Sequence, residues 1–215
     1  VVDLPKDIVN VMEEHPYVYP SSVEMRSYNP TVRGHTKQVK KAVASLKKAE
    51  RPVLYVGGGA VTAEASGLVT KLAELLNSPV TCTLMGLGAF PGTHPQFVGM
   101  LGMHGTMEAN KTMHNADCIL ALGARFDDRV TNNVAKFCPH AEIIHVDIDP
   151  ASISKTVNAH IPVVGSVDVV VEQILELLKP EELSGQSEKL ADWWQQIEQW
   201  RSRQCLTYDQ GDTVI

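Results

Sequence analysis

Cys118-Ile119-Leu120-Ala121-Leu122 is an unbroken apolar run that leads directly into Gly123-Ala124-Arg125-Phe126-Asp127-Asp128-Arg129. A second apolar run begins at Ile143 and ends on Asp147. Unbroken runs of this length are typical of strands that are buried on both faces of a parallel sheet. A glycine and cations after one run, and a carboxylate at the end of the next, therefore indicate a parallel sheet with a polar edge.

Similar runs alternate with helical patterns along the chain. The sequence predicts strands at 53–56, 80–83, 118–122, 143–147 and 163–164. It predicts helices at 34–49, 64–76, 108–115 and 167–178, and one more that is capped by Asp149 and starts at Pro150. This alternation favours an α/β fold, a three-layer Rossmann-like parallel sheet with helices on both faces.

Composition excludes several classes of protein. The chain has 215 residues, 44% of them hydrophobic, and a net charge of −6, which argues against a nucleic-acid surface. No apolar run approaches the roughly 20 residues of a membrane span. The four cysteines form no metal-binding spacing, so we expect buried free thiols and a cytoplasmic protein.

The pattern divides the chain into three parts. Residues 1–33 are proline-rich and are expected to be an inter-domain connector, and residues 34–180 form the central α/β domain. Residues 181–215 are expected to be a polar linker and a helix that leads to a missing C-terminal domain. The apolar stripe of that helix, which includes Trp193 and Trp200, has no evident partner in the predicted sheet. The absence of an initiator methionine suggests an excised middle segment of a larger protein.

Several loops after predicted strands have the residues of an adenine-dinucleotide site. Glycines, as in Gly57-Gly58-Gly59, let backbone approach a phosphate, arginine neutralises it, and a strand-end carboxylate can hold ribose hydroxyls. The loops 83–88 and 100–105 mix glycine with methionine and leucine, which suits the flat face of a ring system. Each feature alone also fits a structural role: a tight turn, a core methionine, or a solvated ion-pair cluster.

Catalytic signatures are missing. There is no GxSxG elbow, no Walker motif and no HExxH. His104 is the only histidine in a glycine loop, where a hydrogen bond to a ligand is more plausible than metal ligation. The sequence thus predicts a binding site with neither catalytic residues nor a metal.

The chain resembles the acetohydroxyacid (acetolactate) synthase family of catalytic subunits, in particular the bacterial isozyme III type. The resemblance covers essentially all 215 residues. Its ordered motifs are Val2-Asp3-Leu4-Pro5-Lys6-Asp7, Tyr55-Val56-Gly57-Gly58-Gly59, Thr83-Leu84-Met85-Gly86-Leu87-Gly88, Leu101-Gly102-Met103-His104-Gly105, Arg125-Phe126-Asp127-Asp128-Arg129, Asp147-Ile148-Asp149 and residues 193–200.

The resemblance implies a three-domain enzyme that depends on thiamine diphosphate and Mg²⁺, both held by the other domains. This chain looks like the middle domain, which binds FAD and would be inert alone. The whole enzyme joins a two-carbon unit from pyruvate to pyruvate or 2-oxobutyrate on the way to branched-chain amino acids. Its flavin takes no net redox part. Homo-oligomers with a small regulatory subunit are implied.

Carried over residue by residue, the family's FAD contacts fall on sixteen positions. They are Arg26, Gly57, Gly58, Gly59, Thr83, Leu84, Leu101, Gly102, Met103, His104, Gly123, Arg125, Asp127, Arg129, Asp147 and Ile148. One departure is Ser166, where the family usually has aspartate near the adenine, so Ser166 is not among the expected contacts.

Two alternatives stay open. The chain could be the middle domain of another thiamine-diphosphate enzyme, such as pyruvate oxidase or glyoxylate carboligase. It could also be a non-catalytic scaffold whose flavin site is incomplete.

Overall fold

The computed structural model describes residues 3–10, 16–22 and 28–208. The chain divides into two units, residues 1–30 and 31–215. In the first, the described residues include the short helix α1 (Lys6–Val9), which has no buried side chain. The second unit holds the sheet and every other element described below.

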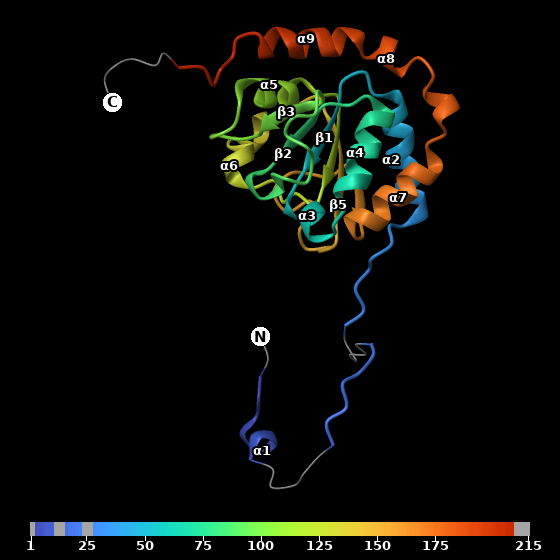
Figure 1. Ribbon diagram of the computed structural model, residues 1–215, viewed down its shortest axis with the longest axis vertical. Helices are drawn as coiled ribbons and strands as arrows, with labels where there is room; N and C mark the ends of the chain where they lie inside the picture. Colours follow the sequence, from blue (N-terminus) through green and yellow to red (C-terminus); the bar gives the residue numbers. More distant parts are fainter. Residues whose placement is uncertain (1–2, 11–15, 23–27, 209–215) are drawn as a thin grey trace. The chain divides into compact units, whose positions relative to one another are not determined.

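The sheet has six strands in the order β3-β2-β1-β4-β5-β6, and every neighbouring pair is parallel (Figure 1). The strands are β1 (Pro52–Val56), β2 (Val80–Cys82), β3 (Phe97–Met100), β4 (Cys118–Leu122), β5 (Glu142–Asp147) and β6 (Ile161–Val164). The order reverses between β1 and β4, as in doubly wound sheets. The predicted Rossmann-like fold is therefore confirmed.

Side chains alternate along each strand, so the sheet builds a core on each face. Leu54 and Val56 of β1 belong to one core, and Val53 and Tyr55 belong to the other. The first core is covered by α2 (Thr36–Lys48), α4 (Ser66–Leu76) and α7 (Val167–Leu177), and the second by α5 (Met107–Asn115) and α9 (Ala191–Arg201). Figure 1 shows α2, α4 and α7 on the opposite side of the sheet from α5.

Helix α9 differs from the sequence interpretation, because its apolar stripe does have a partner in the sheet. Trp193 and Ile197 are buried in the second core. The indole Nε1 of Trp193 donates to the carbonyl of Pro52 at 3.2 Å, and that of Trp194 donates to Asn77 O at 3.0 Å. The helix thus closes the amino ends of the strands. The expectation that residues 181–215 lead to a further domain stays a prediction.

The structure differs from the sequence prediction at several other places. The helix expected from Pro150 was wrong, because that segment is a series of turns and bends, and strand β3 had not been predicted. The expected polar linker contains η3 (Pro180–Leu183) and α8 (Gln186–Lys189), where Leu183 and Gln186 are buried. The short elements α3 (Gly58–Thr62), η1 (Leu84–Gly86), α6 (Asp128–Thr131) and η2 (Val134–Lys136) interrupt segments that were expected to be loops or helix starts.

The cysteines follow the expectation only in part. Cys82, Cys118 and Cys138 are buried free thiols, and their burial raises the pKa of each to about 12. Cys205 is exposed instead, and its Sγ contacts the Glu108 carboxylate at 3.1 Å. Among the described residues, none of the helices is both long enough and apolar enough to span a membrane.

Candidate cofactor-binding site

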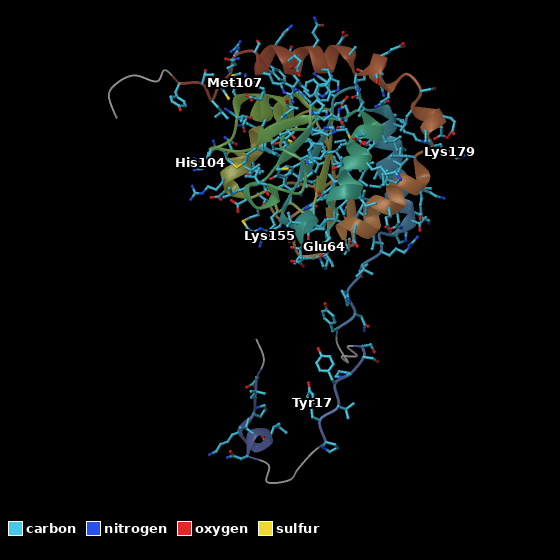
Figure 2. All side chains as sticks on the ribbon, in the orientation of Figure 1. Tyr17, Glu64, His104, Met107, Lys155 and Lys179 are labelled. Carbon is cyan, nitrogen blue, oxygen red and sulfur yellow. The ribbon has the colours of Figure 1, made fainter. Side chains whose placement is uncertain are left out.

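A cavity of about 750 Å³ lies at the carboxyl ends of the strands, around the point where the strand order reverses. The loops that follow β1, β2, β3, β4 and β5 all contribute to its wall. Within the unit of residues 31–215, Figure 2 shows Glu64, after α3, and Lys155, after β5, at the edge opposite α9, and His104 close to the position of α6 in Figure 1. Ligands of open α/β sheets bind at this edge.

Most of the sequence-predicted site residues line this one cavity. They are Gly58, Gly59, Thr83, Leu84, Leu101, Met103, His104, Gly123, Arg125, Asp127, Arg129 and Asp147. These residues extend from position 58 to position 147 of the chain, and the parallel topology brings them to one edge of the sheet. Arg26 lies outside the described residues.

Gly57 is close to the cavity but has a different role. A Cβ at Gly57 would lie 2.2 Å from the carbonyl oxygen of Gly123, and a Cβ at Gly123 would lie 2.6 Å from Gly59 Cα. The Gly59 amide also donates to Gly123 O at 3.1 Å. These glycines therefore let the loops after β1 and β4 touch each other, which positions Gly58 and Gly59 on the cavity wall.

Gly102 and Ile148 do not line the cavity either. Gly102 has φ +108°, and a Cβ there would lie 2.8 Å from the carbonyl oxygen of Arg129. The next amide, Met103 N, donates to that same carbonyl at 2.9 Å. Gly102 thus lets the loop after β3 contact α6. The side chain of Ile148 is half exposed and is not part of the cavity wall.

Phe126 sets the geometry of the two arginines. It has φ +54°, is 1% exposed, and its ring centroid lies 5.4 Å from that of Tyr55 and 5.1 Å from that of His145. With Phe126 turned into the core, its neighbours Arg125 and Asp127 face outward. The Arg125 side chain is 77% exposed and lies 3.6 Å from the Asp127 carboxylate.

Asp127 also begins α6. Its carboxylate accepts from the Arg129 amide at 3.1 Å, which fixes the start of the helix that carries Arg129. The pKa of Asp127 is lowered, first by hydrogen bonding with Asp128 and then by the Arg129 amide and the two arginines. The wall at this point thus combines two cations with an ionised carboxylate.

Asp147 ends β5 as the sequence indicates. Its Oδ1 accepts from the Asp149 amide at 2.9 Å, and its Oδ2 lies 3.9 Å from Nε2 of the buried His145. Burial lowers the pKa of His145, an effect that the Asp147 charge opposes. Asp149 caps the following turn through the Ala151 amide at 2.9 Å, so both carboxylates hold this segment and only Oδ1 of Asp147 is used for it.

Six lining residues were not predicted: Tyr55, Met85, Met100, Ala124, Val130 and Ser152. Met85 and Met100 stand within loops that the sequence already marked as glycine- and methionine-rich. Tyr55 was interpreted as part of a buried strand and of a family motif but not as a contact, although a hydroxyl inside an otherwise apolar run was a usable signal. The described residues contain no group of three or more His, Cys, Asp or Glu side chains that could hold a metal ion.

Comparison with known proteins decides the family. The pattern described as "Thiamine pyrophosphate enzyme, central domain" matches residues 39–174. This chain belongs to that family. The matched segment runs from α2 to α7 and includes all six strands of the sheet.

Acetolactate synthases are among the similar proteins of this family. The chain is 62% identical over 97% of its length to the acetolactate synthase isozyme 3 large subunit of Escherichia coli (strain K12), and 56% identical over its whole length to the acetolactate synthase large subunit of Haemophilus influenzae. It is 41% identical over 96% of its length to an acetolactate synthase of Mycobacterium avium. The chain spans 36%, 37% and 33% of these relatives, respectively. The resemblance predicted from the sequence motifs is confirmed.

Proposed function

We propose that this chain is the FAD-binding central domain of an acetolactate synthase large subunit. The observation that carries the proposal is the cavity of about 750 Å³ at the strand-order reversal, which gathers loops from five strands. This volume is within the range of small-molecule sites. A cofactor longer than the cavity would extend along the open edge of the sheet.

The residues present fit a flavin dinucleotide. Arg125 and Arg129 supply charge for a pyrophosphate, and guanidinium groups suit phosphate oxygens. Asp147, with Oδ2 free of a hydrogen bond to His145, is placed to accept from ribose hydroxyls. Met85 and Met103 offer polarisable apolar surface for the flat ring system. When bound, the flavin would supply a structural platform, since no net redox step is implied.

The exposed side chains at the rim of the cavity favour a binding site that this chain supplies only in part. Leu84, Met85 and Met103 are 69%, 75% and 64% exposed around the cavity. Apolar side chains gathered at the rim of a binding site mark surface that another protein segment covers. In our proposal, neighbouring domains of a longer protein complete the flavin pocket and hold thiamine diphosphate with Mg²⁺, so this chain alone is inert.

The proposed enzyme is cytoplasmic and condenses pyruvate with pyruvate or 2-oxobutyrate. It works as a homo-oligomer of large subunits with a small regulatory subunit. An assay of the longer protein for acetolactate formed from pyruvate tests this activity. Formation of acetolactate supports it, and a protein that consumes pyruvate or glyoxylate without making acetolactate would point to pyruvate oxidase or glyoxylate carboligase chemistry instead.

Flavin binding is tested separately on the 215-residue chain. Titration with FAD, followed by flavin fluorescence, should show saturable binding weaker than micromolar, because part of the pocket comes from elsewhere. Riboflavin, which lacks the pyrophosphate and adenosine, should bind more weakly than FAD. Sub-micromolar binding would contradict the incomplete pocket, and equal affinity for both ligands would contradict the roles of Arg125 and Asp147.

A further inference from the structure

Tyr55 occupies a fixed position in the wall of the cavity. It is the next-to-last residue of β1 and stands in one row of the sheet with Ala121 of β4 and His145 of β5. The small Ala121 leaves room for the Phe126 ring, which lies between Tyr55 and His145 at centroid distances of 5.4 Å and 5.1 Å. The Tyr55 ring is therefore held on one side by packing, and its hydroxyl has little freedom to choose a partner.

The hydroxyl of Tyr55 has no hydrogen-bond partner among the described residues. A buried polar group without a partner is costly, and native structures contain few of them. Thr112 and His145 also carry buried side-chain atoms without a partner in the described part of the chain, but only Tyr55 lines the cavity. The missing partner of Tyr55 can therefore come from a ligand.

The chemistry of this partner follows from its surroundings. Burial, and then the charge of Asp127, raise the pKa of Tyr55 far above its ordinary value, so the phenol keeps its proton. A protonated phenol in this place offers a donor, which suits an acceptor oxygen. Arg125 and Asp127 line the same cavity as Tyr55, and the proposed site assigns Arg125 to the pyrophosphate, so the part of a bound nucleotide nearest to Tyr55 is its sugar–phosphate portion.

We propose that the Tyr55 hydroxyl donates a hydrogen bond to an oxygen of the sugar–phosphate portion of the bound flavin nucleotide. This inference rests on the proposed FAD site and adds a buried contact that is not among the sixteen positions expected from the sequence. Less than 1 Å² of the hydroxyl is accessible, so the nucleotide reaches it by displacing a wall side chain. Met85 and Met100 line the same cavity and have the flexibility that such a displacement requires.

Tyr55→Phe is the direct test, because it removes the hydroxyl and keeps the ring that packs on Phe126. FAD affinity of the 215-residue chain should fall about tenfold, which corresponds to about 1.4 kcal/mol. In the same variant, the midpoint of chemical unfolding without ligand should stay the same or rise, because a buried hydroxyl without a partner is lost.

Thr112→Val is the matched control. Thr112 is fully buried in α5 and does not line the cavity, and within residues 3–10, 16–22 and 28–208 it carries the other buried hydroxyl without a partner. This variant should change the unfolding midpoint in the same direction and leave FAD affinity unaltered. Fluorescence titration and denaturant unfolding of the three proteins give both readouts.

The outcomes distinguish failure of the proposed Tyr55 contact from failure of the proposed FAD site. Tyr55→Phe that binds FAD as tightly as the wild type overturns the proposed contact and leaves the FAD site in place. A lower unfolding midpoint for ligand-free Tyr55→Phe overturns it as well, because the hydroxyl then has a partner within the protein. A wild-type chain that shows no FAD binding, even at high ligand concentration, removes the proposed site and the Tyr55 contact together.

Discussion

At the scale of single residues, the site depends on a contrast between buried and exposed neighbours. Phe126 is buried in the left-handed region at φ +54°, and Arg125 and Asp127 on either side of it reach the cavity. A non-glycine residue at positive φ is strained, and such strain is found where a site requires a particular backbone. The buried ring thus accounts for the exposure of the charges.

Arg125→Ala should weaken flavin binding and leave stability unchanged. Among the described residues Arg125 pairs only with Asp127, at 3.6 Å, and exposed pairs of this kind contribute about 0–1 kcal/mol to folding. Loss of a charge-assisted contact with phosphate costs about 1.5–3 kcal/mol, or roughly tenfold or more in Kd. FAD titration measures this loss of affinity, and Lys41→Ala, on the exposed side of α2, is the control that should bind FAD as the wild type does. An unchanged Kd for Arg125→Ala would assign Arg125 to a surface ion pair.

His145 should make the fold sensitive to acid. Burial lowers its pKa in the folded state, so the unfolded chain takes up the proton first as the pH falls. Its contribution to stability is complete above an unfolded pKa of about 6.5 and is lost as the pH falls from there through the lower folded pKa.

Denaturant unfolding at a series of pH values checks this prediction. His145→Leu should reduce the fall in unfolding free energy between about pH 7.5 and pH 5. His140→Gln, at an exposed position, should keep the wild-type dependence. Identical pH curves for wild type and His145→Leu would show that His145 does not couple folding to protonation.

At the scale of elements, the loops at the carboxyl edge are held by contacts with one another. The loop after β1 touches the loop after β4 through Gly57 and Gly123, and the loop after β3 touches α6 through Gly102. Each contact needs a position without Cβ. The glycine-rich motifs therefore serve loop packing first, and the cavity wall is a consequence of that packing.

Gly57→Ala and Gly67→Ala should have opposite effects on stability. A Cβ at Gly57 meets backbone at 2.2 Å, so the substitution should destabilise the fold by about 1–3 kcal/mol or more. A Cβ at Gly67, in the first turn of α4, meets nothing within 4 Å, and alanine should add a few tenths to about 1 kcal/mol. Chemical unfolding of both variants gives the comparison. Equal stabilities would mean that the two loops can separate without cost.

At the scale of the whole molecule, the cavity exists only in the folded chain. Its lining extends from Tyr55 to Ser152 along the sequence, so the unfolded chain has no equivalent site. The ends of the sheet are also distinct: α9 closes the amino ends of the strands, and the loops leave the carboxyl ends open. The exposed apolar side chains of Leu84, Met85 and Met103 lie at this open edge.

FAD should therefore stabilise the folded chain by mass action. At a free FAD concentration a hundredfold above Kd, the free energy of unfolding should rise by about 2.7 kcal/mol. Thermal or chemical unfolding at several FAD concentrations measures the effect, and riboflavin at the same concentrations should have a smaller one. A transition that does not move with FAD concentration would contradict a native-state flavin site.

The sequence by itself determined the layered fold, because buried strands and amphipathic helices have different periodicities and each was visible. Its ordered motifs also resemble those of the acetolactate synthase family, and the comparisons confirmed that resemblance. Those motifs contained most of the residues that line the cavity, and one of them includes Tyr55. They did not mark Tyr55 as a contact, because the missing hydrogen-bond partner of its hydroxyl is a property of its three-dimensional surroundings.

Only the tertiary structure decided what each glycine contacts, where the stripe of α9 packs, and which way Phe126 turns. Loops from different strands approach each other closely, and α9 is buried against strands that are distant from it in sequence. Both features depend on contacts between remote segments of the chain. Such contacts leave no local pattern in the chain, because their energy comes from packing that exists only after the sheet has formed.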